Sequence, residues 1–274
     1  GGGRSTPFLT QSTPLVAGGA SPRGQVFPRD RTAGSTTPVS YAFLGGPAND
    51  SCQNPSLSAD GRYIAFQSAA SNLLATPTLG FVKIFVRDRI TGILTLASRS
   101  SAGAEALGDS QNAMISANGR VVAFQSGAAN LVAGDSNGLV DVFVHDLDAS
   151  LTERVSVSSS GAEANGPSNI TENPPGISMD GRYVAFPSFA SNLAPGWVGW
   201  TAIYLRDRAL GQTTLASVSS SGVAANNTSL QPTLSSDGRF LVFQSLGDNL
   251  AAGDTNASYD IFVRGPLPGP WSNL

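Results

Sequence analysis

The feature that most constrains this chain is a fivefold internal repeat. The aromatic residue of the motif F-x-R-D-R, or of a variant of it, recurs at Phe27, Phe85, Phe143, Tyr204 and Phe262, in steps of 58 residues with a single step of 61. A second motif, G-R-x-x-x-F, begins at Gly61, Gly119, Gly181 and Gly238, with a degenerate copy at Gly3. Repeats of this length are typical of solenoids, arrays and propellers.

Each unit reads as four short strands, and residues 54–100 give the clearest example. The segments 54–58, 62–68, 82–87 and 93–98 are expected to form strands a, b, c and d. Between the first two, Asp60-Gly61 predicts a two-residue hairpin turn in which both central residues have positive φ. Strands b and c are apolar on both faces, so we expect them to be covered on both sides.

These patterns predict an all-β fold, a five-bladed antiparallel β-propeller, because a blade packs between two neighbours. We expect one domain, with units at about 3–53, 54–111, 112–172, 173–230 and 231–274. The first unit lacks strand a and the last lacks strand d. The segment Pro270-Trp271-Ser272 resembles strand a of other units, so we expect the N- and C-terminal segments to pair and close the ring.

Composition narrows the possible partners. The net charge is −3, from 16 basic and 19 acidic residues without runs, which argues against nucleic acid as a partner. No apolar run is long enough to span a membrane, and Gly1–Arg4 does not resemble a signal peptide, so a processed chain is expected. Cys52 is the only cysteine and Lys83 the only lysine. The low charge and the abundance of Ser and Thr suggest a periplasmic or secreted bacterial protein.

A family resemblance follows from the motif S-x-D-G-R-Y-[IV]-A-F-x-S, found at Ser58–Ser68 and Ser178–Ser188, together with V-F-V-x-D. These residues resemble the TolB-like, WD-like propeller repeats of bacterial envelope proteins, over about residues 3–272. The resemblance implies the propeller fold. It does not imply an activity, because the family includes protein-binding scaffolds, sensor domains and non-catalytic halves of peptidases.

Two loops before strand c have a pattern that suits calcium. Asp135, Asn137 and Asp141 precede it in one unit, and Asp254, Asn256 and Asp260 in another. Oxygen ligands at alternate positions of a tight loop suit a hard cation, although the closing bidentate carboxylate of the full calcium motif is missing. The alternative is that these side chains cap the loop by binding its backbone. No other cofactor is expected.

The sequence offers no set of residues that is typical of catalysis. His145 is the only histidine, and it occupies a position held by Arg29, Arg87, Arg206 and Arg264 in the other units. A structural role is therefore expected for it. Carboxylates outside the repeated turns, which a glycoside hydrolase could use, are Asp50, Asp109 and Glu172. Nothing marks two of them as a matched pair.

One loop breaks the symmetry of the repeats. In the fourth unit Trp197 and Trp200 replace the polar loop of the other units, and an insertion around 163–175 brings in Glu172 and Asn173. Aromatic residues on an exposed loop often anchor protein interfaces, so these four residues are the candidate partner-binding surface. The alternative is that the tryptophans fold over their own blade.

The function expected from these observations is a non-catalytic, extracytoplasmic propeller. It would act as a protein-binding or scaffold subunit on a larger envelope or membrane-associated complex, without a transmembrane segment of its own. Two alternatives stay open: a carbohydrate-binding, lectin-like propeller, and a glycoside hydrolase that uses carboxylates of the central channel.

Overall fold

The part of the chain that the structure describes forms five successive antiparallel sheets. The computed structural model describes residues 5–10, 24–168 and 173–267, and this part of the chain contains strands and no helix. Sheet 1 holds β1 (Ser5–Thr10), β2 (Gln25–Asp30) and β3 (Ser35–Thr36). Sheet 2 holds β4 (Cys52–Leu57), β5 (Tyr63–Ser68), β6 (Lys83–Asp88) and β7 (Leu94–Leu96). Sheet 3 holds β8 (Ser110–Ile115), β9 (Val121–Ser126), β10 (Asp141–Asp146) and β11 (Leu151–Arg154).

Sheets 4 and 5 complete the series. Sheet 4 holds β12 (Gly176–Ile177), β13 (Tyr183–Ser188), β14 (Ala202–Asp207) and β15 (Gln212–Leu215), and sheet 5 holds β16 (Ser229–Leu234), β17 (Leu241–Ser245) and β18 (Asp260–Arg264). Each sheet keeps its strands in chain order, as predicted. The first strands of sheets 2, 3 and 5 begin at 52, 110 and 229, two residues before the expected unit boundaries. Among the described residues, no helix is long and apolar enough to cross a membrane.

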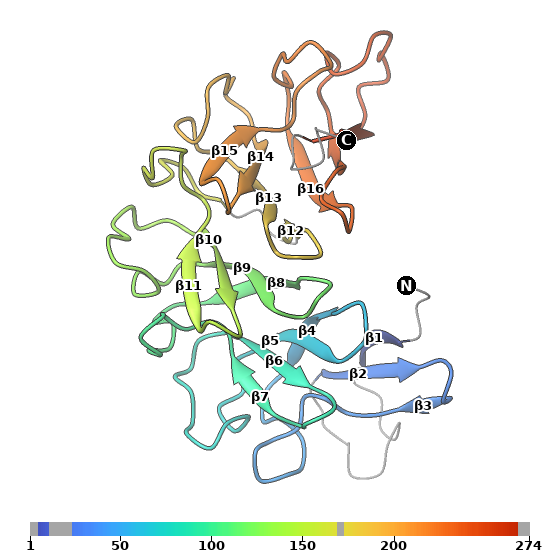
Figure 1. The fold of residues 1–274 in the computed structure, drawn as a ribbon, viewed down its shortest axis with the longest axis vertical. Helices are drawn as coiled ribbons and strands as arrows, with labels where there is room; N and C mark the ends of the chain where they lie inside the picture. The colour runs from blue at the N-terminus through green and yellow to red at the C-terminus, as the bar shows by residue number, and fades with distance from the viewer. Residues whose placement is uncertain (1–4, 11–23, 169–172, 268–274) are drawn as a thin grey trace.

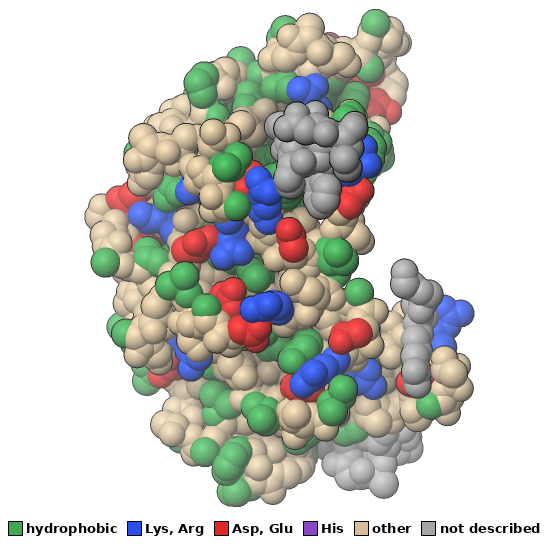
Figure 2. All heavy atoms as spheres, in the orientation of Figure 1, with side chains coloured by type: hydrophobic (Ala, Val, Ile, Leu, Met, Phe, Trp, Pro, Cys, Tyr) green, Lys and Arg blue, Asp and Glu red, His purple; other side chains and the backbone are tan. Residues whose placement is uncertain are grey.

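The five sheets lie along an arc that is open between the first sheet and the last (Figure 1). The space-filling view in Figure 2 shows the same C-shaped outline. Within the described ranges, no strand of sheet 1 pairs with a strand of sheet 5. The segment Pro270-Trp271-Ser272, which was expected to close the ring, lies outside the described residues. Ring closure, and with it a complete five-bladed propeller, stays a prediction.

The core is built from repeated aromatic pairs at the centre of each sheet. Because strands b and c are antiparallel, the spacing of 19 residues places Phe66 directly opposite Phe85, with ring centroids 5.8 Å apart. The other four sheets have the same pair at 5.8–6.1 Å. The pairs of sheets 2 to 5 are packed against the preceding sheet, so that Phe186 and Tyr204 contact the apolar face that carries Val142 and Val144. Both faces of the middle strands of sheets 2, 3 and 4 are therefore buried, as predicted, whereas β18 of sheet 5 keeps one face exposed.

The hairpin turn between strands a and b differs from the prediction. Only the glycine has positive φ, +74° at Gly61, whereas Asp60 does not. The Gly61 N–H donates to the Ser58 carbonyl over 2.9 Å, and the Ser58 hydroxyl binds the Asp60 carboxylate over 2.6 Å. The predicted two-residue turn is thus wrong in type and right in place. Asp60 is required as a hydrogen-bond acceptor, since its carboxylate also binds the N–H of Arg62.

Candidate functional site

The loop between β13 and β14 carries the two tryptophans. Gly196 and Gly199 both have φ of +96°, a conformation that favours glycine, and they fold the loop back on itself. This turn lets the Trp197 indole N–H donate to the Trp200 carbonyl over 2.9 Å. Trp197 is half-buried against the core between sheets 3 and 4. Trp200 is 47% exposed and Val198 is 52% exposed. One tryptophan therefore braces the loop and the other presents its ring to solvent.

The other two candidate partner-binding residues are placed differently. Asn173 is buried, and its side-chain oxygen accepts a hydrogen bond from the Gln231 N–H over 3.1 Å. Its backbone carbonyl accepts from the Gln125 side chain over 3.0 Å. Asn173 therefore links neighbouring sheets. Glu172 lies outside the described residues, so the structure does not place it beside the tryptophan loop.

The first calcium-like loop uses its side chains to bind one another and the backbone. The Asn137 amide donates to Asp141 over 2.8 Å, and its oxygen accepts from the Leu139 N–H over 2.9 Å. In the second loop, Asn256 donates to Asp260 over 3.0 Å and accepts from the Ser258 N–H over 2.8 Å. These bonds are those of the capping alternative. Asp254 joins the second loop through a longer contact of 3.5 Å with the Asn256 N–H.

Arg154 faces the carboxylates of the first loop. Its guanidinium Nη1 lies 2.6 Å from Glu163, 3.1 Å from Asp135 and 3.4 Å from Asp141. Burial raises the pKa of Asp135 and of Asp141 above the usual range, whereas hydrogen bonds from Ser136, followed by Arg154, lower the pKa of Glu163 to about 2. Among the described residues, no group of three or more His, Cys, Asp or Glu side chains is disposed to hold a metal ion. The calcium hypothesis for both loops stays a prediction.

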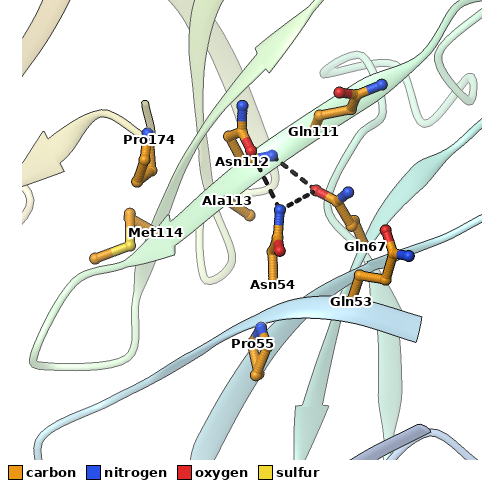
Figure 3. Close-up of a pocket in the computed structure, with 9 residues that line it drawn as sticks. All are labelled: Gln53, Asn54, Pro55, Gln67, Gln111, Asn112, Ala113, Met114 and Pro174. Carbon is orange, nitrogen blue, oxygen red and sulfur yellow. Dashed lines mark hydrogen bonds between the residues drawn. The ribbon is translucent and has the colours of Figure 1, made fainter. Parts of the chain in front are cut away.

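A cavity of about 520 Å³ lies between sheets 2 and 3, at their first strands β4 and β8, which we call the inner strands (Figure 3). Amide side chains form one side of it, where Asn54 donates to Asn112 over 3.2 Å and to Gln67 over 3.4 Å. Gln53 and Gln111 are exposed at its rim, and Met114 lies near Pro174 on the other side. Asn54 and Asn112 have φ of +48° and +56°, at bulges of β4 and β8. The lining is uncharged and offers both donors and acceptors.

Sequence reasoning did not identify this amide cavity, although a signal for it was present. Asn54, Asn112, Asn173 and Gln231 stand at the same position of successive units. Asparagine tolerates positive φ better than other residues with a side chain, so a repeated asparagine before strand b predicts a bulge there. The expected strand 54–58 includes Asn54 as a regular strand residue, whereas the structure has a bulge there.

The acid–base candidates take up structural positions. His145 is fully buried, with Nδ1 2.8 Å from the Thr152 hydroxyl, and burial lowers its pKa from 6.5 to about 4. The Asp109 carboxylate accepts the N–H of Val82 over 2.9 Å, and Asp50 accepts the N–H of Ser51 over 2.7 Å. In the described part of the chain, these candidates bind the protein's own backbone and hydroxyl groups. The third carboxylate, Glu172, lies outside it.

Comparisons with known proteins bear on the fold. No family model and no curated protein matches the chain. The β-propeller domain of the Trilobed protease from Pyrococcus furiosus is similar with a TM-score of 0.53 and 10% identity, over 96% of this chain and 66% of that one. TolB from Acinetobacter baumannii is similar with a TM-score of 0.50 and 14% identity, over 90% of this chain and 50% of that one. This chain thus spans half the length of that TolB. At such identities the similarity shows the fold alone: the chain has an all-β fold of the β-propeller type, as TolB does.

Proposed function

We propose that this chain is a non-catalytic propeller that binds other proteins outside the cytoplasm. It acts as a scaffold subunit docked on a larger envelope or membrane-associated assembly. Two arguments support the proposal, one from an exposed aromatic loop and one from the positions of the acid–base groups. The similarity to TolB and to a protease propeller domain concerns the fold and leaves the role open.

The observation that carries the proposal is the braced loop of Trp197 and Trp200. An interface anchor is most effective when it is held in its bound conformation before the partner arrives, because less conformational freedom is then lost on binding. The 2.9 Å bond from Trp197 to the Trp200 carbonyl and the half-buried Trp197 ring provide this restraint. Trp200 and Val198 then offer a large apolar surface to a protein partner.

The positions of the acid–base groups favour binding over catalysis. A nucleophilic or general-base mechanism at neutral pH needs a side chain that can reach a substrate with a suitable pKa. His145 is buried between strands, and its pKa of about 4 keeps it neutral. Asp50 and Asp109 bind neighbouring backbone N–H groups. Hydrolase screens are therefore expected to give no turnover above background.

The experiment that tests the proposal measures the native mass of the chain after gentle extraction from its source cells. The wild type is expected to run in a complex of defined composition, and Trp200→Ala is expected to run alone. Leu210→Ala is the matched control, because Leu210 is also an exposed apolar residue in a turn of sheet 4. Release of the partner by both variants, or by neither, would remove the tryptophan loop from the interface.

A lectin-like role is the second candidate, and the amide cavity favours it. Sugars bind through paired donors and acceptors, which Gln53, Asn54 and Gln111 could supply. Titration with a glycan library measures this directly. Saturable binding that Gln53→Ala and Gln111→Ala abolish, with the tryptophan loop unchanged, would move the assignment from protein to carbohydrate.

A further inference from the structure

Among the described residues, sheet 5 ends at strand c, whereas each of the other sheets has a further segment beside that strand. In sheets 1 to 4, one residue of strand c binds the outer segment through both of its backbone groups. Its N–H donates to a serine hydroxyl over 2.9–3.1 Å, and its carbonyl accepts a backbone N–H over 2.8–3.1 Å. These residues are Val26 with Ser40 and Val39, Ile84 with Ser98 and Ala97, Val142 with Ser156 and Val155, and Ile203 with Ser217 and Ala216. Ile261 occupies this position in β18, and no such partner for it occurs among the described residues.

The turn that follows strand c in the other sheets is not repeated at Gly265 and Pro266 of sheet 5. At the last residue of strand c in sheets 1 to 4, an aspartate accepts two backbone N–H groups and shapes the turn into strand d. The four aspartates are Asp30, Asp88, Asp146 and Asp207. Gly265 stands at this position in sheet 5, and Pro266 follows it. The N–H of Leu267 binds the Arg239 carbonyl over 2.7 Å, as Arg89, Leu147 and Arg208 bind the equivalent carbonyls of sheets 2 to 4. The aspartate that accepts the next N–H groups is absent from this position.

On the same edge, Arg264 lacks one of the two contacts that its counterparts make, as far as the described residues show. In three sheets the side chain next to the end of strand c binds a threonine hydroxyl of the outer strand: Arg29 with Thr36 over 3.1 Å, His145 with Thr152 over 2.8 Å and Arg206 with Thr213 over 3.0 Å. Arg264 occupies this position in β18. It donates to the Ser219 carbonyl over 3.1 Å, much as Arg206 donates to Ser158 over 3.3 Å. Its equivalent of the threonine contact is not formed within the described ranges.

The outer segments that complete the other sheets share a short signature. Each reads T-x-x-[AV]-S, at residues 36–40, 152–156 and 213–217, with a leucine in place of the threonine at 94–98. The threonine faces the arginine or histidine, the alanine or valine supplies the backbone N–H, and the serine supplies the hydroxyl. All four segments are already paired within their own sheets.

The same strand exposes apolar side chains that are buried in the other sheets. Ile261 is 68% exposed and Val263 is 66% exposed, whereas Ile203 and Leu205 at the same positions of sheet 4 are 0% and 5% exposed. Figure 1 shows sheet 5, in red, at the open end of the arc. An aliphatic face next to an open strand edge fits a polypeptide better than a sugar or a nucleic acid.

We propose that the edge of β18 is a docking site for an extended strand of a partner protein. The strand carries the signature T-x-x-[AV]-S and adds antiparallel to Ile261–Arg264. Its threonine hydroxyl binds Arg264, its serine hydroxyl accepts the Ile261 N–H, and the N–H of its alanine or valine binds the Ile261 carbonyl. This site is separate from the tryptophan loop, so it stands or falls independently of that loop's role.

The test uses a labelled peptide with the sequence of residues 210–218, which contains the signature of sheet 4, and measures its binding to the full chain by fluorescence anisotropy. Saturable binding is expected. A peptide with proline at the position of Ala216 is expected not to bind, because it lacks the N–H that the Ile261 carbonyl accepts. A peptide with Thr213→Val is expected to bind about 10-fold more weakly, as is common when a hydrogen bond to a charged group is lost.

Variants of the protein locate the contact. Arg264→Met is expected to lower the affinity of the protein for the parent peptide. It is expected to leave the affinity for the Thr213→Val peptide unchanged, because the two changes remove the same hydrogen bond. Arg31→Met, an exposed arginine of sheet 1, is the matched control and is expected to bind as the wild type does. Trp200→Ala is also expected to bind normally, which separates this site from the proposed interface.

Three results would overturn the proposal. The first is absence of saturable binding, and the second is equal binding of the proline peptide. The third is self-association of the chain, measured by sedimentation and abolished by Ile261→Asp. That result would make a second copy of the chain the occupant of the edge.

Discussion

The side-chain amide of Asn54 donates to the side-chain oxygen of Asn112 over 3.2 Å, across the boundary between sheets 2 and 3. The two residues occupy the same position in successive repeats and both have positive φ. Asn112 continues the chain of amides, because its own amide donates to Gln125 over 2.8 Å and its N–H to Gln67 over 2.9 Å. Polar side chains at the bulges of β4 and β8 therefore connect neighbouring sheets along these inner strands.

Substitution of Asn112 separates the hydrogen bonds from the backbone conformation. Asn112→Ala is expected to lower the free energy of unfolding by about 3 kcal/mol, because it leaves buried partners unsatisfied and places alanine at positive φ. Asn112→Gly loses the same bonds without that strain, and is expected to cost about 1 kcal/mol less. Urea unfolding of the two variants gives the comparison. Equal values would show that the backbone at this bulge is not strained.

Arg154 provides a test of the calcium hypothesis. Arg154→Leu removes the cation that faces Asp135, Asp141 and Glu163, and is expected to lower stability by about 3–5 kcal/mol because buried carboxylates lose their partner. Millimolar calcium is then expected to restore part of the melting temperature of this variant. The melting temperature of the wild type is expected not to change with calcium or EDTA.

Two further results would decide the hypothesis. Arg154→Lys keeps a positive charge and is the control, so it is expected to be less destabilised and insensitive to calcium. A rise in the melting temperature of the wild type with calcium would instead favour a real site. The variants Asp141→Asn and Asp260→Asn would then identify which loop holds the ion.

Much of the architecture follows from the spacing of residues along the chain. The 19-residue interval from Phe66 to Phe85 predicts a cross-strand pair, and the pair is found. The brace between Trp197 and the Trp200 carbonyl was not predictable, because it depends on the conformation at Gly196 and Gly199. The position of Arg154 was not predictable either. It lies 13 residues after Asp141 and 9 residues before Glu163 in the chain, and the three side chains meet only because strand d lies beside strand c. Sequence periodicity indicates which face of a sheet a side chain lies on. A functional site also depends on loop conformation and on which strands become neighbours, and periodicity does not indicate these.

His145 predicts how stability depends on pH. Burial lowers its pKa from 6.5 to about 4, so the unfolded chain binds a proton in this range that the folded chain does not. The contribution of His145 to stability is therefore complete above pH 6.5 and falls as the pH is lowered. It levels off below about pH 4, after a loss of about 3 kcal/mol. His145→Gln retains a polar group near Thr152 without titrating in this range. The difference in unfolding free energy between wild type and variant is expected to follow this curve, and a constant difference would contradict it.

Two glycines with similar backbone conformations separate strain from packing between sheets. Gly161 has φ of +84° with no atom within 4 Å of the position of a Cβ, so Gly161→Ala is expected to cost about 1–2 kcal/mol from backbone strain alone. Gly181 has φ of +75°, and a Cβ there would lie 2.6 Å from a methyl carbon of Val121 in the preceding sheet. Gly181→Ala must displace a buried strand residue as well, and is expected to cost at least about 2 kcal/mol more. Guanidinium unfolding of both variants measures the difference. If the two substitutions cost the same, the turns of sheet 4 do not set the distance between neighbouring sheets, and the repeated glycine is needed only for its backbone conformation.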